Sequence, residues 1–382
     1  MSYDVVVVGA GIGGLTVAAL LSARGLSVCL LERQSQVGGC VARVEFAGHD
    51  FEPGMGIYES FGVGEVYEQL FAALPVDAPQ VSLITSPYIV RLPDGTDVKL
   101  TAGETRFPNL PHGDLYTIAG GPASLAERLA ESIKKSGGSV RLNSPVLRLA
   151  YDESGRAVGV DLLSGERVFA ERAIVSNLTI WDTYGKLVGL NRTPPELKKR
   201  LNTLQGRGAY VVYASIEETA IPRLPGELML VSGNDESEGE FGEFNLAIAS
   251  SHTAPPGKRS VTLTSSTDVH SWFAYHTSEE DFEEQDQAAL EQFWTRLHAA
   301  IPELGGDIEV IETANPRTYY ELTRRKLGMV QGVEEPFGTE ETFLPNLFMV
   351  GDTVAAARLD SIVRSALDLA DRLLTQRRKG AK

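Results

Sequence analysis

The stretch YDVVVVGAGIGGLTVAALLSARGLSVCLLER, residues 3–33, decides the fold. Its residues 5–8 are four valines, a short β-branched run that is typical of a strand buried on both faces of a parallel sheet. A glycine-rich turn follows, and then an apolar helical stripe that ends at Gly25. A second apolar strand, residues 27–31, ends at Glu32. The stretch therefore predicts a unit of strand, helix and parallel strand.

The glycines of the turn stand where side chains would hinder a bound dinucleotide. Gly9 permits a tight turn, Gly11 lets a pyrophosphate approach bare backbone, and Gly14 lets the helix lie close to the strand. The helix N-terminus offers free N–H groups and a positive dipole end to the phosphates. The alternative is a glycine turn that serves packing alone. The predicted dinucleotide-binding residues of this stretch are Gly9, Gly11, Ile12, Gly13, Gly14, Glu32 and Arg33.

Glu32 indicates which dinucleotide can bind. It lies eighteen residues after Gly14, close to the usual spacing for the carboxylate that accepts both ribose hydroxyls. A carboxylate at this point repels a 2′-phosphate, so an NADP-type ligand is disfavoured.

Composition places the chain among soluble globular proteins. Its 382 residues suit two domains, and 43% are hydrophobic while 23% are charged. No uncharged apolar run is long enough to span a membrane, and the apolar start belongs to the first strand rather than to a signal peptide, so we expect a cytoplasmic location. The net charge of −16 argues against nucleic acid and against electrostatic adsorption to an acidic membrane. It leaves room for a weak peripheral membrane contact through an apolar patch.

Cysteine and histidine are too sparse for a metal site. The chain has two cysteines, Cys29 inside the second strand and Cys40 in the following loop, and they form no CxxC spacing. The six histidines show no ligand spacing such as HxxxH. We therefore predict no bound metal, and core packing for Cys29.

The block after Glu32 carries the first resemblance to a known family. The pair Gly38-Gly39 permits a second close backbone approach to a ligand, and Phe51-Glu52-Pro53-Gly54 follows it. This order resembles that of the FAD-dependent amine oxidase and phytoene desaturase superfamily, in which an acid, a Gly-Gly pair and an F-D/E-x-G segment follow the GxGxxG helix. The resemblance implies FAD rather than NAD, with Gly38 and Gly39 at the cofactor.

The middle of the chain continues the resemblance. A Gly-Gly-opened helix over residues 120–138 precedes strands at 139–142, 146–149, 157–162, 167–169 and 172–177, the last returning to the nucleotide sheet. The resemblance implies that the segment near Val146 contacts the adenine end of FAD. In full-length phytoene desaturases a long helical insertion separates the hairpin expected at 88–100 from this helix, whereas here only residues 101–115 lie between them.

The segments from residue 181 onward suggest a second, mixed sheet over the flavin ring. Longer strands are expected at residues 209–216, 244–250 and 260–267, followed by an amphipathic helix over 278–300. The predicted fold class is α/β, a Rossmann-like FAD-binding domain with a mixed-sheet α+β substrate domain. The expected FAD-binding domain comprises residues 1–60, 114–180 and 335–382, and the expected substrate domain comprises residues 61–113 and 181–334.

The stretch ANPRTYYELTRRKLGMVQG, residues 314–332, resembles a segment that lies near the flavin in carotenoid desaturases and carotenoid isomerases. Asn315 stands in place of the usual threonine, and Leu322 in place of the usual aromatic residue. Candidates for the active-site wall are Arg317, Tyr319, Tyr320, Arg324, Arg325, Arg358 and Asp360. Catalytic roles are assigned among these to Arg317, Tyr319, Arg324 and Arg358.

The C-terminal part repeats the pattern of a strand, a glycine and a helix. Residues 346–353 read as a strand that ends in Gly351-Asp352, and a helix is expected over 360–374. The resemblance implies that Asp352 lies by the pyrophosphate and ribityl chain, and that the helix N-terminus points at flavin N1 and O2, where its dipole stabilises reduced flavin. The cofactor-binding residues implied here are Gly351, Asp352, Ser361 and Ile362. The family commonly has Gly-x-Gly after the aspartate, whereas this chain has AAARLD at 355–360.

Three functions remain open. The chain has no second GxGxxG, so electrons would pass to oxygen, a quinone, a carrier or back to the substrate. The preferred hypothesis is an FAD-dependent desaturase, saturase or isomerase of an apolar, isoprenoid or polyene substrate. The second is an amine oxidase-type oxidase of a small molecule. The third is a prenyl- or lipid-binding carrier without flavin, since prenyl-binding GDP dissociation inhibitors resemble the same scaffold.

Overall fold

The structure is a computed structural model. It describes residues 1–51, 54, 56–100, 113–233, 241–249, 254–273, 279–333, 335–338 and 342–380, without the side chains of 279 and 376–380. Glu52 and Pro53 of the F-D/E-x-G segment and residues 101–112 of the short bridge lie outside the described residues.

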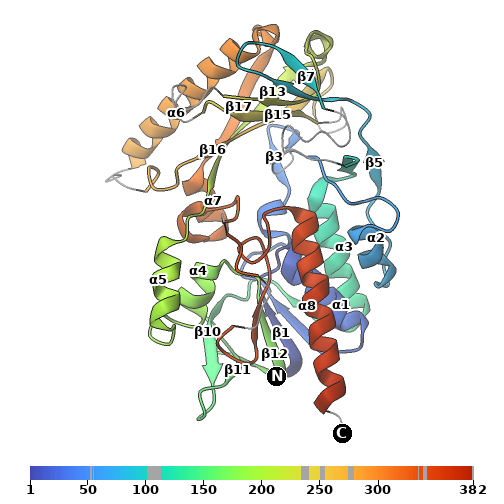
Figure 1. The fold of residues 1–382 in the computed structure, drawn as a ribbon, viewed down its shortest axis with the longest axis vertical. Coiled ribbons are helices and arrows are strands. Elements are labelled where there is room, and N and C mark those ends of the chain that lie inside the picture. The colour runs from blue at the N-terminus through green and yellow to red at the C-terminus, as the bar shows by residue number, and fades with distance from the viewer. Residues whose placement is uncertain are drawn as a thin grey trace.

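In the described part of the chain, seven strands form a first sheet with a parallel centre (Figure 1). They are β1 (Ser2–Val8), β2 (Val28–Leu31), β9 (Ser139–Arg141), β10 (Val146–Tyr151), β11 (Ala157–Leu162), β12 (Arg167–Ser176) and β18 (Leu347–Met349). β1 pairs in parallel with β2 and β12, β2 with β9, and β12 with β18. β10, β11 and β12 form an antiparallel meander at one edge. This arrangement confirms the predicted Rossmann-like sheet.

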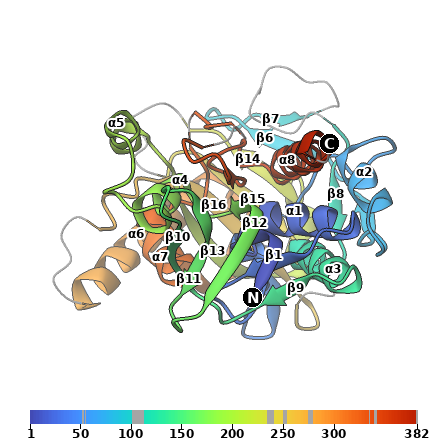
Figure 2. The same cartoon turned by 90° about the horizontal axis from the view of Figure 1, so that it is seen from below.

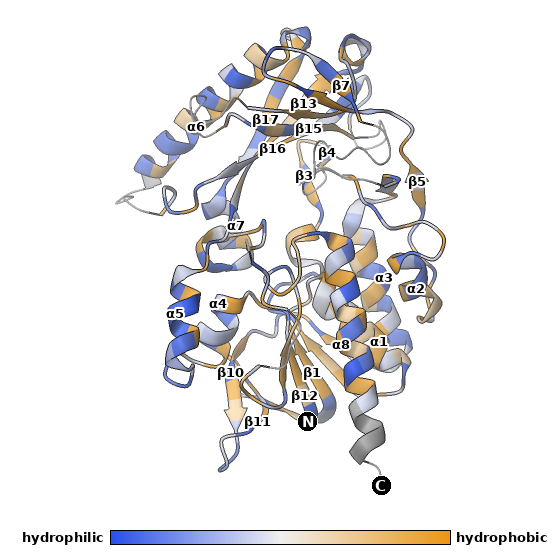
Figure 3. Ribbon diagram, in the orientation of Figure 1, coloured by the Kyte–Doolittle hydropathy of each residue, from blue (hydrophilic) through white to orange (hydrophobic). Residues whose placement is uncertain are grey.

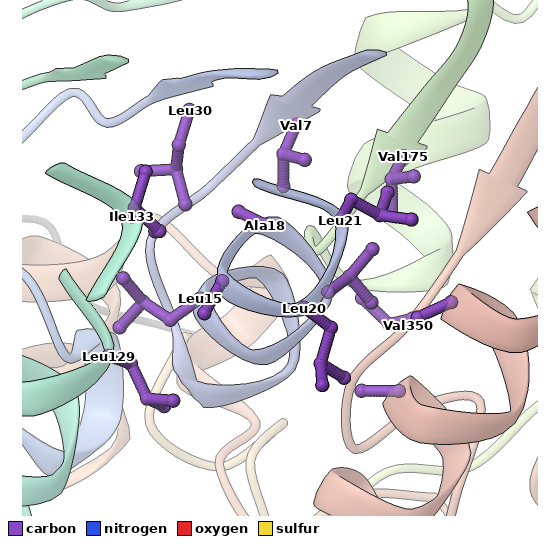
Figure 4. Close-up of a cluster of buried hydrophobic side chains, with 14 of the residues drawn as sticks. Val7, Leu15, Ala18, Leu20, Leu21, Leu30, Leu129, Ile133, Val175 and Val350 are labelled. Carbon is purple, nitrogen blue, oxygen red and sulfur yellow. The ribbon is translucent and has the colours of Figure 1, made fainter. Parts of the chain in front are cut away.

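One side of the first sheet is covered by helices, and the innermost of them, α1 (Ile12–Ala23), is buried. The helices that form one core cluster with it are α2 (Val66–Ala72), α3 (Gly121–Lys135) and α8 (Leu359–Gly380). Figures 1 and 2 show α1, α3 and α8 on one side of the strands, and α4 (Ile180–Asp182) and α5 (Pro195–Thr203) on the other. Leu15, Leu20 and Leu21 of α1 lie among residues from both flanking strands and helices (Figure 4). An apolar helix without a polar face is stable only when it is buried in this way.

The strands predicted at 167–169 and 172–177 are one continuous strand, β12. Its two ends have different neighbours along one edge, because Arg167–Phe169 faces β11 and Ile174–Ser176 faces β18. Along the other edge β1 pairs with the strand over almost its whole length, with an irregularity between Tyr3 and Val5. The continuous partner holds the chain extended between the two predicted segments, so the separate strands were a wrong prediction.

The second sheet has the order β17-β13-β16-β15-β14-β6-β7 in the described residues, and its β14–β6 pair is parallel while the other pairs are antiparallel. Its strands are β6 (Tyr88–Arg91), β7 (Asp97–Lys99), β13 (Gly208–Glu217), β14 (Leu228–Val231), β15 (Phe244–Ile248), β16 (Lys258–Thr267) and β17 (Ile308–Ala314). The predicted mixed sheet and the hairpin at residues 88–100 are therefore confirmed. Figure 3 shows the strands at the centre of the first sheet as hydrophobic, whereas α6 (Glu279–Ala300), which covers the second sheet, alternates between polar and apolar residues.

Alternate side chains of the second sheet pack on opposite faces. Tyr210, Val212 and Ala214 of β13 belong to the cluster that contains Phe293 and Leu297 of α6. The other face of the sheet points toward the first sheet and is described below.

The remaining elements of the described residues are short. They are η1 (Gly39–Val41), β3 (Val44–Phe46), β4 (His49–Phe51), β5 (Val81–Leu83), β8 (Tyr116–Ile118), η2 (Thr183–Leu187), η3 (Glu218–Arg223), η6 (Pro302–Leu304), α7 (Pro316–Thr323) and η7 (Lys326–Gly328). The hairpin of β3 and β4 and the helix α7 lie between the sheets in Figure 1. The domain boundaries expected from the sequence stay a prediction.

Substituting a core residue of α1 tests this packing. Leu21 has no exposed surface, and Leu21→Ala is expected to lower the free energy of unfolding by about 2–5 kcal/mol because the cavity cannot collapse fully. Leu163→Ala is the control, since that side chain is 68% exposed and its loss is expected to change stability by about 0.5 kcal/mol or less. Urea denaturation followed by circular dichroism measures both. Equal effects of the two substitutions would contradict the packing described here.

Candidate cofactor and active site

The two glycine turns predicted from the sequence lie against each other. The Gly38 N–H donates to the Ala10 carbonyl at 2.8 Å, and Gly38 forms an isolated parallel bridge with Gly11. A Cβ at Gly39 would lie 3.4 Å from the Gly11 Cα, and Gly38 and Gly39 both have positive φ. Both turns therefore present bare backbone to the same region.

The C-terminal segment reaches the same glycine turn. A Cβ at Gly13 would lie 3.3 Å from the Gly351 nitrogen and 3.2 Å from Ile362 Cγ2. Ser361 and Ile362 belong to the first turn of α8, and Gly351 follows β18 with φ of 117°. Two helix N-termini, those of α1 and α8, thus approach each other where an anionic or electron-rich group would be stabilised.

Asn177, which follows β12, fills the space above the turn. Its amide nitrogen would lie 2.5 Å from a Cβ at Gly11, and its amide oxygen 2.8 Å from a Cβ at Gly13 and 3.2 Å from one at Gly351. The absence of a side chain at Gly11 therefore also makes room for Asn177, in addition to the role predicted from the motif. The sequence analysis did not assign Asn177 to the site, because only the fold brings residue 177 to residue 11.

Glu32 is held in place by backbone donors. The Ala10 N–H donates to Oε2 and the Gln34 N–H to Oε1, each at 2.8 Å. Each carboxylate oxygen can accept more than one hydrogen bond, so both stay able to accept a ribose hydroxyl. The Ser144 N–H donates to the Glu32 carbonyl at 2.7 Å, which places the segment leading to Val146 beside this end of the cradle.

Arg33 points to the end of α7. Its Nη2 donates to the Leu322 carbonyl at 2.8 Å, so the residue after Glu32 connects the cradle to the segment 314–332.

Arg325 and Asp352 form an ion pair beside the second glycine turn. Arg325 Nη2 lies 2.5 Å from Asp352 Oδ2, and both side chains are largely buried. Burial disfavours the charged form of Arg325, but the carboxylate of Asp352 outweighs it, so the pKa of Arg325 is above its ordinary value. Burial also raises the pKa of the Cys40 thiol, although the positive charge of Arg325 opposes that shift.

The four residues assigned catalytic roles are not brought together. Tyr319 lies inside, in a cluster with Phe51 and Tyr213, and burial raises its pKa well above the ordinary value. Arg317 lies two positions earlier on α7 and therefore faces another direction. It pairs with Glu321 at 3.2 Å and covers the ring of Phe282 in α6.

Arg324 and Arg358 occupy two further places. Arg324 is exposed at the C-terminus of α7 with φ of 56°. Arg358 precedes α8, where it pairs with Glu59 and with Asp360. Of the four residues, only Tyr319 lies in the cluster between the sheets.

The face of the second sheet that points toward the first sheet carries two apolar clusters, and we call it the site face. On β13 it consists of Ala209, Val211 and Tyr213, in one cluster with Phe51 and Tyr319. The second cluster, on β6, β14 and β15, consists of Tyr88, Val90, Leu228, Leu230 and Ala247. Thr262 and Thr264 of β16 lie on the same face between the two clusters, because they pair with β13 on one side and with β15 on the other. Tyr213 contacts the ring of Phe51 with a centroid distance of 4.9 Å. Both clusters are buried under neighbouring apolar side chains such as Phe46 and Ile57.

The described residues contain neither a cluster of metal ligands nor a helix suited to crossing a membrane. No group of three or more His, Cys, Asp and Glu side chains is placed to hold a metal ion there. In the same residues, no helix is both long enough and apolar enough to cross a membrane.

The fold is that of a dinucleotide-dependent enzyme. It has a Rossmann-like sheet, two glycine turns that lie against each other, and a second sheet. Residues 7–74 match the model of an NAD(P)-binding Rossmann-like domain, and residues 91–374 match that of the flavin containing amine oxidoreductases. The chain belongs to the flavin containing amine oxidoreductase family, which confirms the resemblance seen in the sequence and implies a flavin cofactor. The bare backbone of the two glycine turns, beside the N-termini of α1 and α8, fits such a group.

Individual relatives agree with this family. The chain is 26% identical over 258 residues to the chloroplastic prolycopene isomerase of Daucus carota, a match covering 63% of this chain and 41% of that protein. It is 36% identical over 98 residues to the carotenoid 3,4-desaturase of Haloarcula japonica, covering 26% and 20% respectively. The chain thus spans less than half the length of these relatives.

A solved structure supports the fold. Putrescine oxidase bound to putrescine superposes with a TM-score of 0.65 at 15% identity, covering 98% of this chain and 99% of that chain. At this identity the likeness concerns the fold alone.

Replacing a glycine of the cradle is expected to remove the flavin. A Cβ at Gly14 would lie 2.3 Å from the Gly9 carbonyl oxygen, and backbone atoms cannot move aside without moving β1 or α1. Gly14→Ala is therefore expected to lower both the flavin content, measured by visible absorbance per mole of protein, and stability by about 1–3 kcal/mol. Gly185→Ala is the control, because no atom lies within 4 Å of its Cβ position. Full flavin occupancy in Gly14→Ala would contradict the geometry.

Both cysteines are expected to react slowly with alkylating reagents in the folded protein. Burial raises the pKa of Cys29 to about 11 and also raises that of Cys40, and only the thiolate is nucleophilic. At pH 8 iodoacetamide should therefore label neither residue at the rate of a free cysteine, whereas both should be labelled after unfolding in urea. Mass spectrometry of the peptides measures the rates. Fast labelling of Cys40 in the folded protein would show that its thiol is not buried.

Proposed function

We propose that the protein is an FAD-dependent desaturase, saturase or isomerase that acts on an apolar, isoprenoid or polyene substrate. The observation that supports this proposal is the site face, whose two clusters of aromatic and aliphatic side chains would give a hydrocarbon an apolar wall on the side of the second sheet that points toward the first sheet. Burial of a long hydrocarbon against such a surface is favourable at about 25 cal/mol per Å². The likeness to a prolycopene isomerase and a carotenoid 3,4-desaturase supports the same substrate class.

FAD would supply the hydride chemistry through its N5 atom, and the protein would bind and orient the substrate against it. The cofactor would be held by the glycine turns, by Glu32 at the ribose and by Asp352 near the pyrophosphate. Tyr319 and Tyr213 belong to one cluster, and burial raises the pKa of both. Tyr319 therefore keeps its proton at neutral pH and can donate a hydrogen bond, but it is a poor base.

The second candidate is an amine oxidase-type oxidase of a small molecule. The likeness of fold to putrescine oxidase favours it. A carrier without chemistry is disfavoured, because family membership implies an enzyme. The electron acceptor, whether oxygen, a quinone or a carrier, and a weak peripheral membrane contact stay predictions.

The test is a visible spectrum of the purified protein before and after anaerobic addition of substrate. We expect a bound flavin that chromatography identifies as FAD. A polyene in detergent micelles should bleach the flavin, or should be isomerised by the dithionite-reduced protein, as liquid chromatography would show. A diamine such as putrescine should have no effect. Free FAD with the same polyene is the control.

Three outcomes would contradict the proposal in different ways. Absence of flavin from folded protein would reject the cofactor. Bleaching by amines with release of peroxide would favour the second candidate. Inertness toward polyenes under both redox conditions would reject the substrate class alone.

A further inference from the structure

The segment between α7 and η7 turns one of two consecutive arginines inward. Arg324 and Leu327 have left-handed φ values of 56° and 50°, and Gly328 has φ of 63°. A Cβ at Gly328 would lie 1.8 Å from the Pro316 carbonyl oxygen, so glycine is required there. The left-handed residue at 324 ends α7 and leaves its own side chain exposed, while the next side chain, Arg325, is largely buried.

Arg325 connects two segments that are distant in the sequence. Its Nε donates to the Met329 carbonyl at 2.6 Å, which fixes the turn that carries it. Its Nη2 donates to Asp352, directly after Gly351. Its charge also acts on Cys40, directly after the Gly38-Gly39 pair, because it opposes the rise that burial causes in the pKa of that thiol. One guanidinium group therefore joins the C-terminal turn to the segment after α7, close to the second glycine turn.

The positive charge of Arg325 neutralises the carboxylate of Asp352, which would otherwise repel an anionic ligand. Asp352 follows Gly351, whose nitrogen lies by the Gly13 turn, so its carboxylate stands close to the place of the pyrophosphate. A bare carboxylate there would repel the phosphates, and the repulsion is strong where water is scarce. The bound guanidinium cancels this charge and leaves the carboxylate oriented for hydrogen bonds from the ligand.

We propose that Arg325 is a positioning residue for FAD: it neutralises and orients Asp352 and thereby joins the substrate-side segment 314–332 to the cofactor cradle. This inference rests on the proposed function in one respect, that the ligand is FAD. Arg325 need not contact FAD or substrate itself.

The test compares FAD affinity among variants of the charge pair. Arg325→Met removes the charge and keeps the length of the side chain, and it is expected to weaken FAD binding by about tenfold or more, because Asp352 is left unpaired. Arg325→Met combined with Asp352→Asn removes both charges and should recover part of the loss. Arg325→Lys, which keeps the charge but not the fork of donors, should lie between wild type and Arg325→Met. Flavin fluorescence during titration of the deflavinated protein with FAD gives the affinities.

The control is Arg167→Met, which breaks the ion pair of 2.7 Å between Arg167 on β12 and Asp161 on β11. It should leave FAD affinity unchanged. Melting temperatures of the deflavinated variants and the reduction potential of the bound flavin are measured alongside. A merely structural role would lower the melting temperature of Arg325→Met and of the double variant alike, without changing the potential.

Two results would overturn the inference while leaving the proposed function intact. One is a wild-type FAD affinity in Arg325→Met. The other is a double variant that binds FAD no better than Arg325→Met at comparable melting temperature. If Arg325→Met does not fold, the comparison of Arg325→Lys with wild type decides, and equal affinities and potentials would overturn the inference. Wild-type protein that does not bind FAD would instead reject the proposed function.

Discussion

The architecture depends on backbone approaching backbone without side chains between them. At Gly14 a single added carbon would lie 2.3 Å from the carbonyl oxygen of Gly9, and at Gly13 it would meet the backbone of Gly351. These contacts allow α1 to lie on β1 and allow the C-terminal segment to complete the sheet beside β12. The two ends of the chain therefore form one site, although more than three hundred residues separate them.

Hydrogen bonds of Asn315 join the second sheet's covering helix, α6, to α7. Asn315 caps α7 by accepting hydrogen bonds from the Arg317 and Thr318 N–H groups, and its amide donates to Asp286 of α6 at 2.9 Å. The helix that covers the outer face of the sheet is thereby tied to the segment that carries Tyr319 and Arg325 at the site. An asparagine serves here where the related segment has threonine, because its longer amide can cap the helix and reach α6 at once.

Local patterns in the sequence were sufficient for most elements. Valine runs, glycine spacing and helical stripes depend on neighbours in the chain, so β1, α1 and α3 were predicted correctly. What the sequence could not reveal depends on distant neighbours. Asn177 joins the cradle only through the path of β12. Which of Arg324 and Arg325 turns inward depends on one left-handed residue, so the sequence could not reveal that Arg325 is the buried one of the two.

Side chains along β13 alternate between two clusters on opposite faces of the sheet. Positions 210, 212 and 214 pack against α6, while positions 209, 211 and 213 lie on the site face. Because neighbouring positions on a strand point in opposite directions, the volume and polarity of one set can vary while the other set keeps its packing. Diversification of the three odd-numbered positions therefore repacks the cluster that holds Phe51 and Tyr319, while the layer between the sheet and α6 keeps its composition.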